Sequence, residues 1–403
     1  MKHLKVIFPF FISLLILIGC HNGTKNSSTA KDTTKVDSSK LVKAKPEIPK
    51  GNRKFDDVAR FISGLQATDS TTDLIVLHQT KKWQKYSSDF DTSWVRSQDK
   101  RRVSKMEEWR KAELDNTKTD TSTLFYPFSG PDFLNAFTFF PKANKYIMLA
   151  LEPVGTVPDF SKVHGDSLGR YFTAIKNSLN SILNFSFFRT NSMSKDFHSE
   201  ELNGTIPVLF VFIERTGNKI IDVHPITLDS LGNIVAGEFA QKVPKGKTNY
   251  GIQIDFKNPD NDYLQTLYYF SCDLSNGGLD KNHGMVKFVS NLKDETTYLK
   301  SASCLMFHSS FSNIRDMILA HTNMLLQDDS GIPYKYFDKN VWDLKLHGKY
   351  IRPIKLFADD YQKDLREAYI KDSASIKRLD FGIGYNYVLG ESNLMIALRK
   401  AAK

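Results

Sequence analysis

The stretch from Leu124 to Gly155, LFYPFSGPDFLNAFTFFPKANKYIMLALEPVG, constrains the fold most, because it holds the densest run of order-forming residues in the chain. Its pattern predicts a βαβ unit. A short aromatic strand is expected at Leu124–Phe128, a short apolar helix at Phe133–Phe140 and a fully apolar strand at Tyr146–Leu151. Two strands joined through a helix lie parallel, with a right-handed crossover.

The turns that follow these two strands form the first candidate site. In open α/β sheets, ligands gather where the carboxyl ends of strands meet the amino ends of helices, so both turns are expected on one rim. Ser129 is a candidate nucleophile in the first turn, and Glu152 is a candidate general acid or base in the second. The Gly-x-Ser-x-Gly elbow of many hydrolases is absent, because residues 127–131 read Pro-Phe-Ser-Gly-Pro.

Asp132, in the first of these turns, has two interpretations. As a cap it stabilises the positive end of the helix dipole, with Pro131 at the first helical position, and Asp132→Asn then costs only about 0.3–1 kcal/mol. As a catalytic residue it supplies a charge on which any activity depends. Capping is the simpler explanation of these residue types.

Outside this unit the chain alternates between helical and extended patterns. Helices are expected at Phe55–Leu65, Thr72–Leu114 with a break around Ser87–Ser93, Asp166–Asn184, Met285–Leu292, Thr297–Phe307, Phe311–Leu326 and Asp359–Lys371. Strands are expected at Val208–Glu214, Ile220–Ile226, Tyr250–Phe256 and Leu267–Cys272, with a pair at Trp342–Lys355 and closing segments at Phe381–Val388 and Leu394–Leu398. The mixture predicts an α/β or α+β fold whose mixed sheet contains the central βαβ unit, at about 124–151, and antiparallel strands, flanked by helices.

Four aromatic residues, Trp83, Tyr86, Phe90 and Trp94, recur at intervals of three and four and therefore share one helical face. Such a stripe usually belongs to the core. The alternative is an exposed aromatic platform for sugar rings.

Asp328 and Asp329 offer two adjacent carboxylates and are weaker candidates for a binding site. Neither they nor the acidic run at Asp255–Asp262 has the ligand spacing of a calcium loop, and Asp-rich turns commonly bond their own backbone. HExxH, GxxxxGK[ST] and GxGxxG are all missing from the sequence. We therefore expect no metal site and no cofactor.

Three cysteines are present, at positions 20, 272 and 304. Cys272 and Cys304 are interpreted either as separate buried thiols or as a disulfide, which an exported protein would tolerate.

The amino terminus carries a basic segment, an apolar run over Val6–Ile18 and the junction Leu17-Ile18-Gly19-Cys20. This order resembles the signal peptide and lipobox of bacterial lipoproteins. The resemblance implies cleavage before Cys20, acylation of that cysteine and anchoring to membrane lipid in the cell envelope. The expected location is the outer membrane of a Gram-negative bacterium, facing the periplasm or the surface.

Three regions follow from this assignment: a signal peptide at 1–19, a lipidated and disordered basic tether at 20–52, and one large globular domain at 53–403, with a subdivision near 195 as the alternative. The tether lacks the apolar residues that folding requires and would reach about 30 Å. The formal charge of +10 falls to about +4 once the signal peptide and tether are set aside, so no nucleic-acid partner is expected.

YPFSGPDFL and FGIGYNY resemble segments of bacterial proteins of unknown function, which implies no activity. Two hypotheses remain. The first is a non-enzymatic envelope lipoprotein that binds a glycan, peptide or protein partner. The second is a lipid-anchored hydrolase that uses the rim of Ser129, Asp132 and Glu152.

Overall fold

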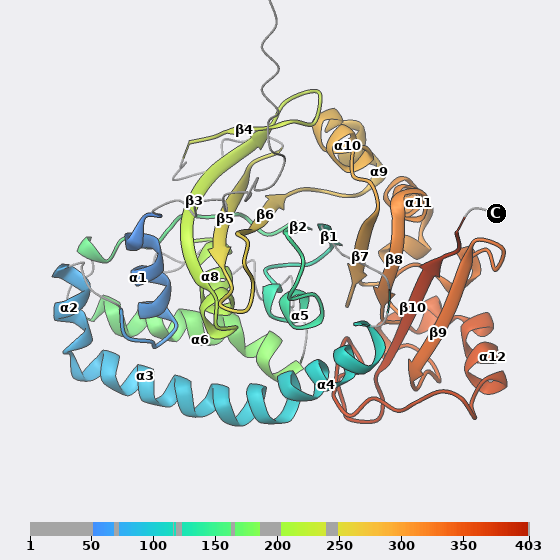
Figure 1. Cartoon of the computed structure of the whole chain (residues 1–403), viewed down its shortest axis with the longest axis horizontal. Helices are drawn as coiled ribbons and strands as arrows, with labels where there is room; N and C mark the ends of the chain where they lie inside the picture. The colour runs from blue at the N-terminus through green and yellow to red at the C-terminus, as the bar shows by residue number, and fades with distance from the viewer. Residues whose placement is uncertain are drawn as a thin grey trace, which may run out of the picture. The chain divides into compact units, whose positions relative to one another are not determined.

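The computed structural model has an α/β fold in which helices flank a mixed sheet of ten strands (Figure 1). It describes residues 51–67, 72–115, 117, 123–162, 166–185, 203–238 and 249–401. The strands are β1 (Thr123–Pro127), β2 (Lys145–Ala150), β3 (Lys219–Leu228), β4 (Ile234–Ala236), β5 (Gly251–Lys257), β6 (Gln265–Ser271), β7 (Glu295–Leu299), β8 (Thr322–Gln327), β9 (Trp342–Gly348) and β10 (Asn393–Arg399). The helices are α1 (Arg53–Ile62), α2 (Thr72–His78), α3 (Lys81–Trp94), α4 (Ser104–Glu113), α5 (Phe133–Phe139), α6 (Ser167–Phe185), α8 (Ile206–Arg215), α9 (Asn276–Asp280), α10 (His283–Ser290), α11 (Ser312–His321) and α12 (Lys363–Lys371).

The sheet has the order β4-β3-β5-β6-β2-β1-β7-β8-β10-β9. Its five central strands, from β6 to β8, are parallel, and antiparallel strands extend it on both sides. The predicted fold class is confirmed. The central βαβ unit is also present: β1 and β2 pair in parallel from Thr123↔Lys145 to Pro127↔Leu149, and α5 connects them.

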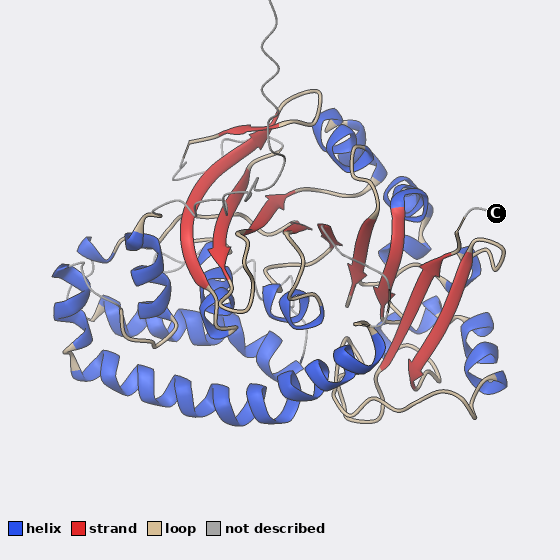
Figure 2. Ribbon diagram, in the orientation of Figure 1, coloured by secondary structure: helices blue, strands red, loops and turns tan. Residues whose placement is uncertain are grey.

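Side chains that alternate along the strands supply two separate cores, one on each face of the sheet. On β1, Leu124 and Tyr126 belong to the core formed with α1, α3, α5, α6 and α8, whereas Phe125 belongs to the core formed with α10, α11 and α12. Figure 2 shows helices on both sides of the strands. Burial on both faces explains why β1 and β2 read as continuous apolar runs.

One predicted strand is a helix. Val208–Glu214 lies within α8, whose residues Ile206–Glu214 are all buried. Its apolar residues occur on every side, so the sequence shows neither the stripe of a surface helix nor the alternation of a half-buried strand, and periodicity cannot separate the two. The prediction of a strand here is therefore wrong.

The reverse error occurs after α10. Thr297–Phe307 was predicted as one helix, but its first residues belong to β7 and the chain then turns. Ser301, Ser303 and Cys304 have φ of 52°, 55° and 54°, in the left-handed region, which no continuous helix accommodates. Likewise, the helix predicted at Phe311–Leu326 ends at His321, and its last residues form β8.

Several boundaries also differ from prediction. α3 runs through Ser87–Ser93 without a break and continues into a π-helical segment, Val95–Val103. Only the first half of Trp342–Lys355 is a strand, and the predicted α12 begins at Lys363 instead of Asp359. No strand forms at 381–388.

The aromatic stripe on α3 is core. Trp83, Tyr86, Phe90 and Trp94 are all buried, and the ring of Tyr86 stacks on that of Phe172 with centroids 4.0 Å apart. An exposed platform for sugars is therefore ruled out at this helix.

The predicted signal peptide, Cys20, nearly all of the tether and the alternative subdivision near 195 lie outside the described residues. Within the described ranges, none of the helices combines the length and apolar character needed to cross a bilayer.

Candidate functional site

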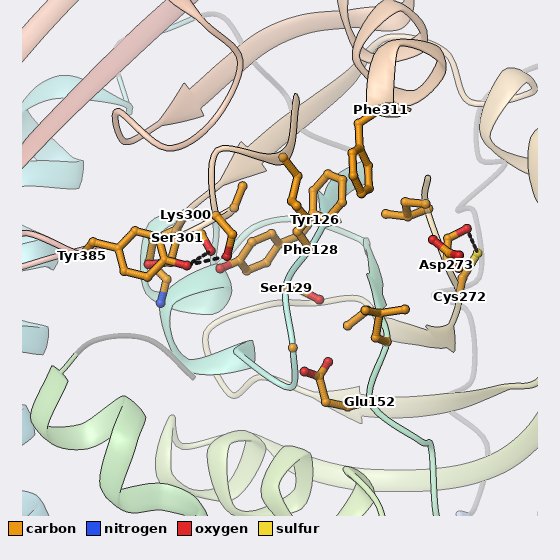
Figure 3. A pocket seen from close by; sticks show the side chains of 17 residues that line it. Tyr126, Phe128, Ser129, Glu152, Cys272, Asp273, Lys300, Ser301, Phe311 and Tyr385 are labelled. Carbon is orange, nitrogen blue, oxygen red and sulfur yellow. Dashed lines mark hydrogen bonds between the residues drawn. The ribbon is translucent and has the colours of Figure 1, made fainter. Parts of the chain in front are cut away.

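A cavity of about 200 Å³ opens at the carboxyl ends of β1, β2, β6 and β7 (Figure 3). These four strands are neighbours in the central sheet, so the loops that follow them meet at one edge. The loop residues that line the cavity are Phe128, Ser129 and Gly130 after β1, Leu151 and Glu152 after β2, Cys272, Asp273 and Leu274 after β6, and Lys300, Ser301, Ala302 and Ser303 after β7. Leu305, Phe311 and Tyr385 add to the walls. The structure thus places Ser129 and Glu152 in one cavity.

Ser129 lies in a tight turn between two residues with positive φ, Phe128 at 60° and Gly130 at 54°. Its backbone N–H donates to the carbonyl oxygen of Leu149 at 3.1 Å, and its hydroxyl makes a long bond of 3.4 Å to the same oxygen. No histidine occurs among the described residues that line the cavity. The described lining therefore offers Ser129 no imidazole, the usual base of a serine nucleophile.

Glu152 is 8% exposed, and its side chain points into the cavity (Figure 3). No other residue in the described part of the chain makes an ion pair or hydrogen bond with this carboxylate. Burial raises its pKa. The turn itself is fixed, because the hydroxyl of Tyr269 donates to the carbonyl of Glu152 at 3.1 Å and the N–H of Thr205 donates to that of Pro153 at 3.0 Å.

Asp132 does not line the cavity but lies behind it. Its carboxylate caps α5 by accepting the backbone N–H of Asn135 at 3.3 Å. It also accepts the hydroxyl of Tyr126 at 2.9 Å and pairs with the ammonium of Lys300 at 2.5 Å. Pro131 precedes the cap, so its predicted place at the first helical position is wrong by two residues. The predicted cost of about 0.3–1 kcal/mol for Asp132→Asn is therefore too small, because the same carboxylate also forms a buried ion pair.

Lys300 is the cation of this pair and lines the cavity. Burial lowers its pKa, while Asp132 acts in the opposite direction. Two more buried charges act on it with opposite signs, since Arg102 lowers the pKa of Lys300 and Asp328 raises it. The positive charge of Lys300 is therefore balanced from behind the cavity.

One wall presents hydroxyl groups. The hydroxyl of Tyr385 donates to the carbonyl of Ser301 at 3.0 Å and lies 2.6 Å from the hydroxyl of Ser303. Asp328 holds this wall from behind by accepting the N–H of Ser301 at 2.9 Å. At Gly384, which has φ of 69°, a side chain would place its Cβ 2.2 Å from a carboxylate oxygen of Asp328, so glycine is required there.

Asp328 and Asp329 do not line this cavity. Asp328 accepts the N–H and hydroxyl of Ser330 at 3.0 and 2.5 Å, and Asp329 accepts the side-chain amide of Asn393 at 2.9 Å. Their contacts join the end of β8 to neighbouring segments, and they follow a strand instead of the helix that the sequence indicated.

Aromatic and sulfur groups complete the lining. The rings of Phe128 and Phe311 meet edge to face with centroids 5.9 Å apart. Cys272 and Cys304 are free and buried, as the interpretation of separate thiols predicts. Burial raises the pKa of Cys272 to about 12, which makes it a poor nucleophile.

The sequence interpretation missed Asp273, Lys300, Phe311 and Tyr385. The signal for Asp273 and Lys300 was their position directly after apolar, strand-like runs. Lys300 was missed because the sequence interpretation assigned 297–307 to a helix, which hid the end of the strand before this residue. Tyr385 carries no local signal, since only tertiary contacts bring it to this edge.

The chain matches no model of a known protein family and no curated protein sequence. Among the described residues, no group of three or more His, Cys, Asp or Glu side chains is arranged to hold a metal ion.

Proposed function

We propose that this protein is a lipid-anchored envelope protein whose globular part binds a small ligand in the cavity at the carboxyl ends of β1, β2, β6 and β7. The observation that carries the proposal is the composition of this cavity. It combines apolar rings with hydroxyl groups and one buried carboxylate, at the position where open α/β sheets hold their ligands. The ligand is a small molecule, or the end of a glycan or peptide.

The anchoring part of the proposal rests on the sequence of the amino terminus. A lipobox ending in Cys20 implies acylation there, and several acyl chains hold a protein far more firmly than one. The basic tether that follows would lie along anionic headgroups. Such a tether would hold the start of the globular part within about 30 Å of its anchor.

Binding is tested with the full-length protein in detergent, by following its melting temperature in the presence of sugars, amino acids and short peptides. Leu151 and Leu231 provide a matched pair of variants, because they are 63% and 66% exposed and only Leu151 lines the cavity. Leu151→Trp should reduce ligand-induced stabilisation by narrowing the cavity, whereas Leu231→Trp should leave it unchanged. Equal effects of both variants, or no stabilising compound, would contradict binding at this site.

A hydrolase is the second candidate function, favoured by the tight turn that carries Ser129 between two residues of positive φ and by the raised pKa of Glu152. The lack of a histidine in the described lining and the ion pairing of Asp132 count against it. Its test is turnover of ester and glycoside substrates. A loss of about 10²-fold or more in Ser129→Ala or Glu152→Gln would establish it, and activity equal to that of buffer would exclude it for those substrates.

A further inference from the structure

The cavity has an excess of negative charge. Among the described lining residues, Glu152, Asp273 and Lys300 carry the full charges. Lys300 pairs with Asp132 behind the cavity at 2.5 Å, so its charge is already compensated. Asp273 is exposed, and its carboxylate accepts the N–H of Ser275 at 2.9 Å. Glu152 and Asp273 thus face a ligand with no lining cation left to balance them.

Glu152 is the informative member of this set. Only 8% of the residue is exposed and its side chain enters the cavity, where its own backbone N–H is the one described group that bonds its carboxylate. Buried charges in proteins are normally paired, because an isolated one is costly to remove from water. A cationic group on the ligand would supply the partner that the described residues do not.

The rest of the lining suits the same ligand group. An ammonium has three N–H donors, and the hydroxyls of Ser129 and Ser303 line the cavity as further acceptors. The rings of Phe128 and Phe311 offer an apolar wall on which the carbon skeleton of a ligand packs, and aromatic faces attract cations.

The geometry points to a small ligand that carries a primary ammonium group, which pairs with Glu152 while its apolar part lies against Phe128 and Phe311. This inference rests on the proposed binding function and narrows it to a class of ligand. An amino sugar, an aliphatic amine and the amino terminus of a peptide share this chemistry, and the experiment separates them.

The test uses three pairs of probes that differ mainly in the ammonium group: glucosamine and glucose, 1,5-diaminopentane and 1,5-pentanediol, and trialanine and its N-acetylated form. Binding to the full-length protein in detergent is measured by calorimetry at neutral pH. At least one amine should bind about 10-fold or more tightly than its neutral twin, because a hydrogen bond to a charged group is lost in the twin. The pair that shows the preference identifies the source of the ammonium.

Glu152→Gln should abolish that preference, because it keeps the shape of the side chain and removes its charge. Glu108→Gln is the matched control at an exposed helix position and should preserve it. Equal binding of both members in every pair would overturn the amine inference and leave the binding function standing. A preference that persists in Glu152→Gln would also overturn it. Failure of all six probes, together with no stabilisation by the wider panel, would count against both proposals.

Discussion

The ammonium of Lys300 lies 2.5 Å from a carboxylate oxygen of Asp132, and both side chains are almost completely buried. Asp132 belongs to the turn after β1, whereas Lys300 follows β7, so the ion pair joins two adjacent strands at the edge where the cavity opens. Because Asp132 compensates the positive charge of Lys300, this charge does not offset the negative charges that line the cavity. It also makes Asp132 more important to stability than a helix cap alone.

Asp132→Asn should lower the free energy of unfolding by about 3–5 kcal/mol, because it removes the ion-pair partner of a buried ammonium. Urea unfolding of the full-length protein measures this change. In a Lys300→Met background the same substitution should cost less, since the ion pair of Asp132 with Lys300 is already absent and Arg102 is the buried cation that still acts on Asp132. A loss of less than about 1 kcal/mol in the original background would show that capping is the main role of Asp132.

Glu152→Gln should raise the free energy of unfolding of the ligand-free protein by about 0.5–2 kcal/mol near pH 8, because it removes a charge that burial disfavours. Burial raises the pKa of Glu152 above its usual value of 4.5. Its contribution to stability is therefore fully present below pH 4.5 and is lost as the pH rises through the raised pKa. Urea denaturation at pH 5 and pH 8 measures this effect. From pH 5 to pH 8 the free energy of unfolding should fall less in the variant than in the original protein. An equal loss in both proteins would contradict the prediction.

Asp329→Asn should remove part of the pH dependence of stability. Burial, together with the nearby charge of Asp328, raises the pKa of Asp329 from 3.8 to about 7. The protein should thus lose stability as the pH rises toward and through 7, and the variant should be the more stable of the two at pH 8. Its amide oxygen can still accept the bond from Asn393.

Asp328→Asn serves as the contrast, because Asp328 accepts three hydrogen bonds from Ser301 and Ser330. The variant replaces one acceptor oxygen with an amide donor and should destabilise the protein by about 1–3 kcal/mol through the lost hydrogen bonds. Identical pH profiles for Asp329→Asn and the original protein would be evidence against the raised pKa.

Cys20→Ser should leave an unlipidated precursor. The test is incorporation of labelled fatty acid by the full-length chain in a Gram-negative bacterium, followed by separation of the membrane fraction. Cys304→Ala is the control and should incorporate label as the original does, since its thiol is buried in the globular part. Undiminished labelling of Cys20→Ser would refute acylation at this residue.

The sequence alone was sufficient to predict the elements whose conformation depends on residues close to one another in the chain. The run from Leu124 to Ala150 could be recognised as strand, helix and strand because its apolar segments are short and separated by turn residues. The same proximity along the chain predicted the cap at Asp132 and the shared rim of Ser129 and Glu152. In each case the interacting groups lie within one unit of the fold.

Only the tertiary structure decided which distant segments meet. An apolar run such as Ile206–Glu214 becomes a helix or a strand according to what surrounds it, and here it is buried on every side. Lys300 reaches Asp132, and Tyr385 reaches Ser303, because β7 pairs with β1 in the sheet and the last segment of the chain returns to the same edge. Local sequence determines the conformation of short segments, but strand pairing depends on the combined burial of the whole chain.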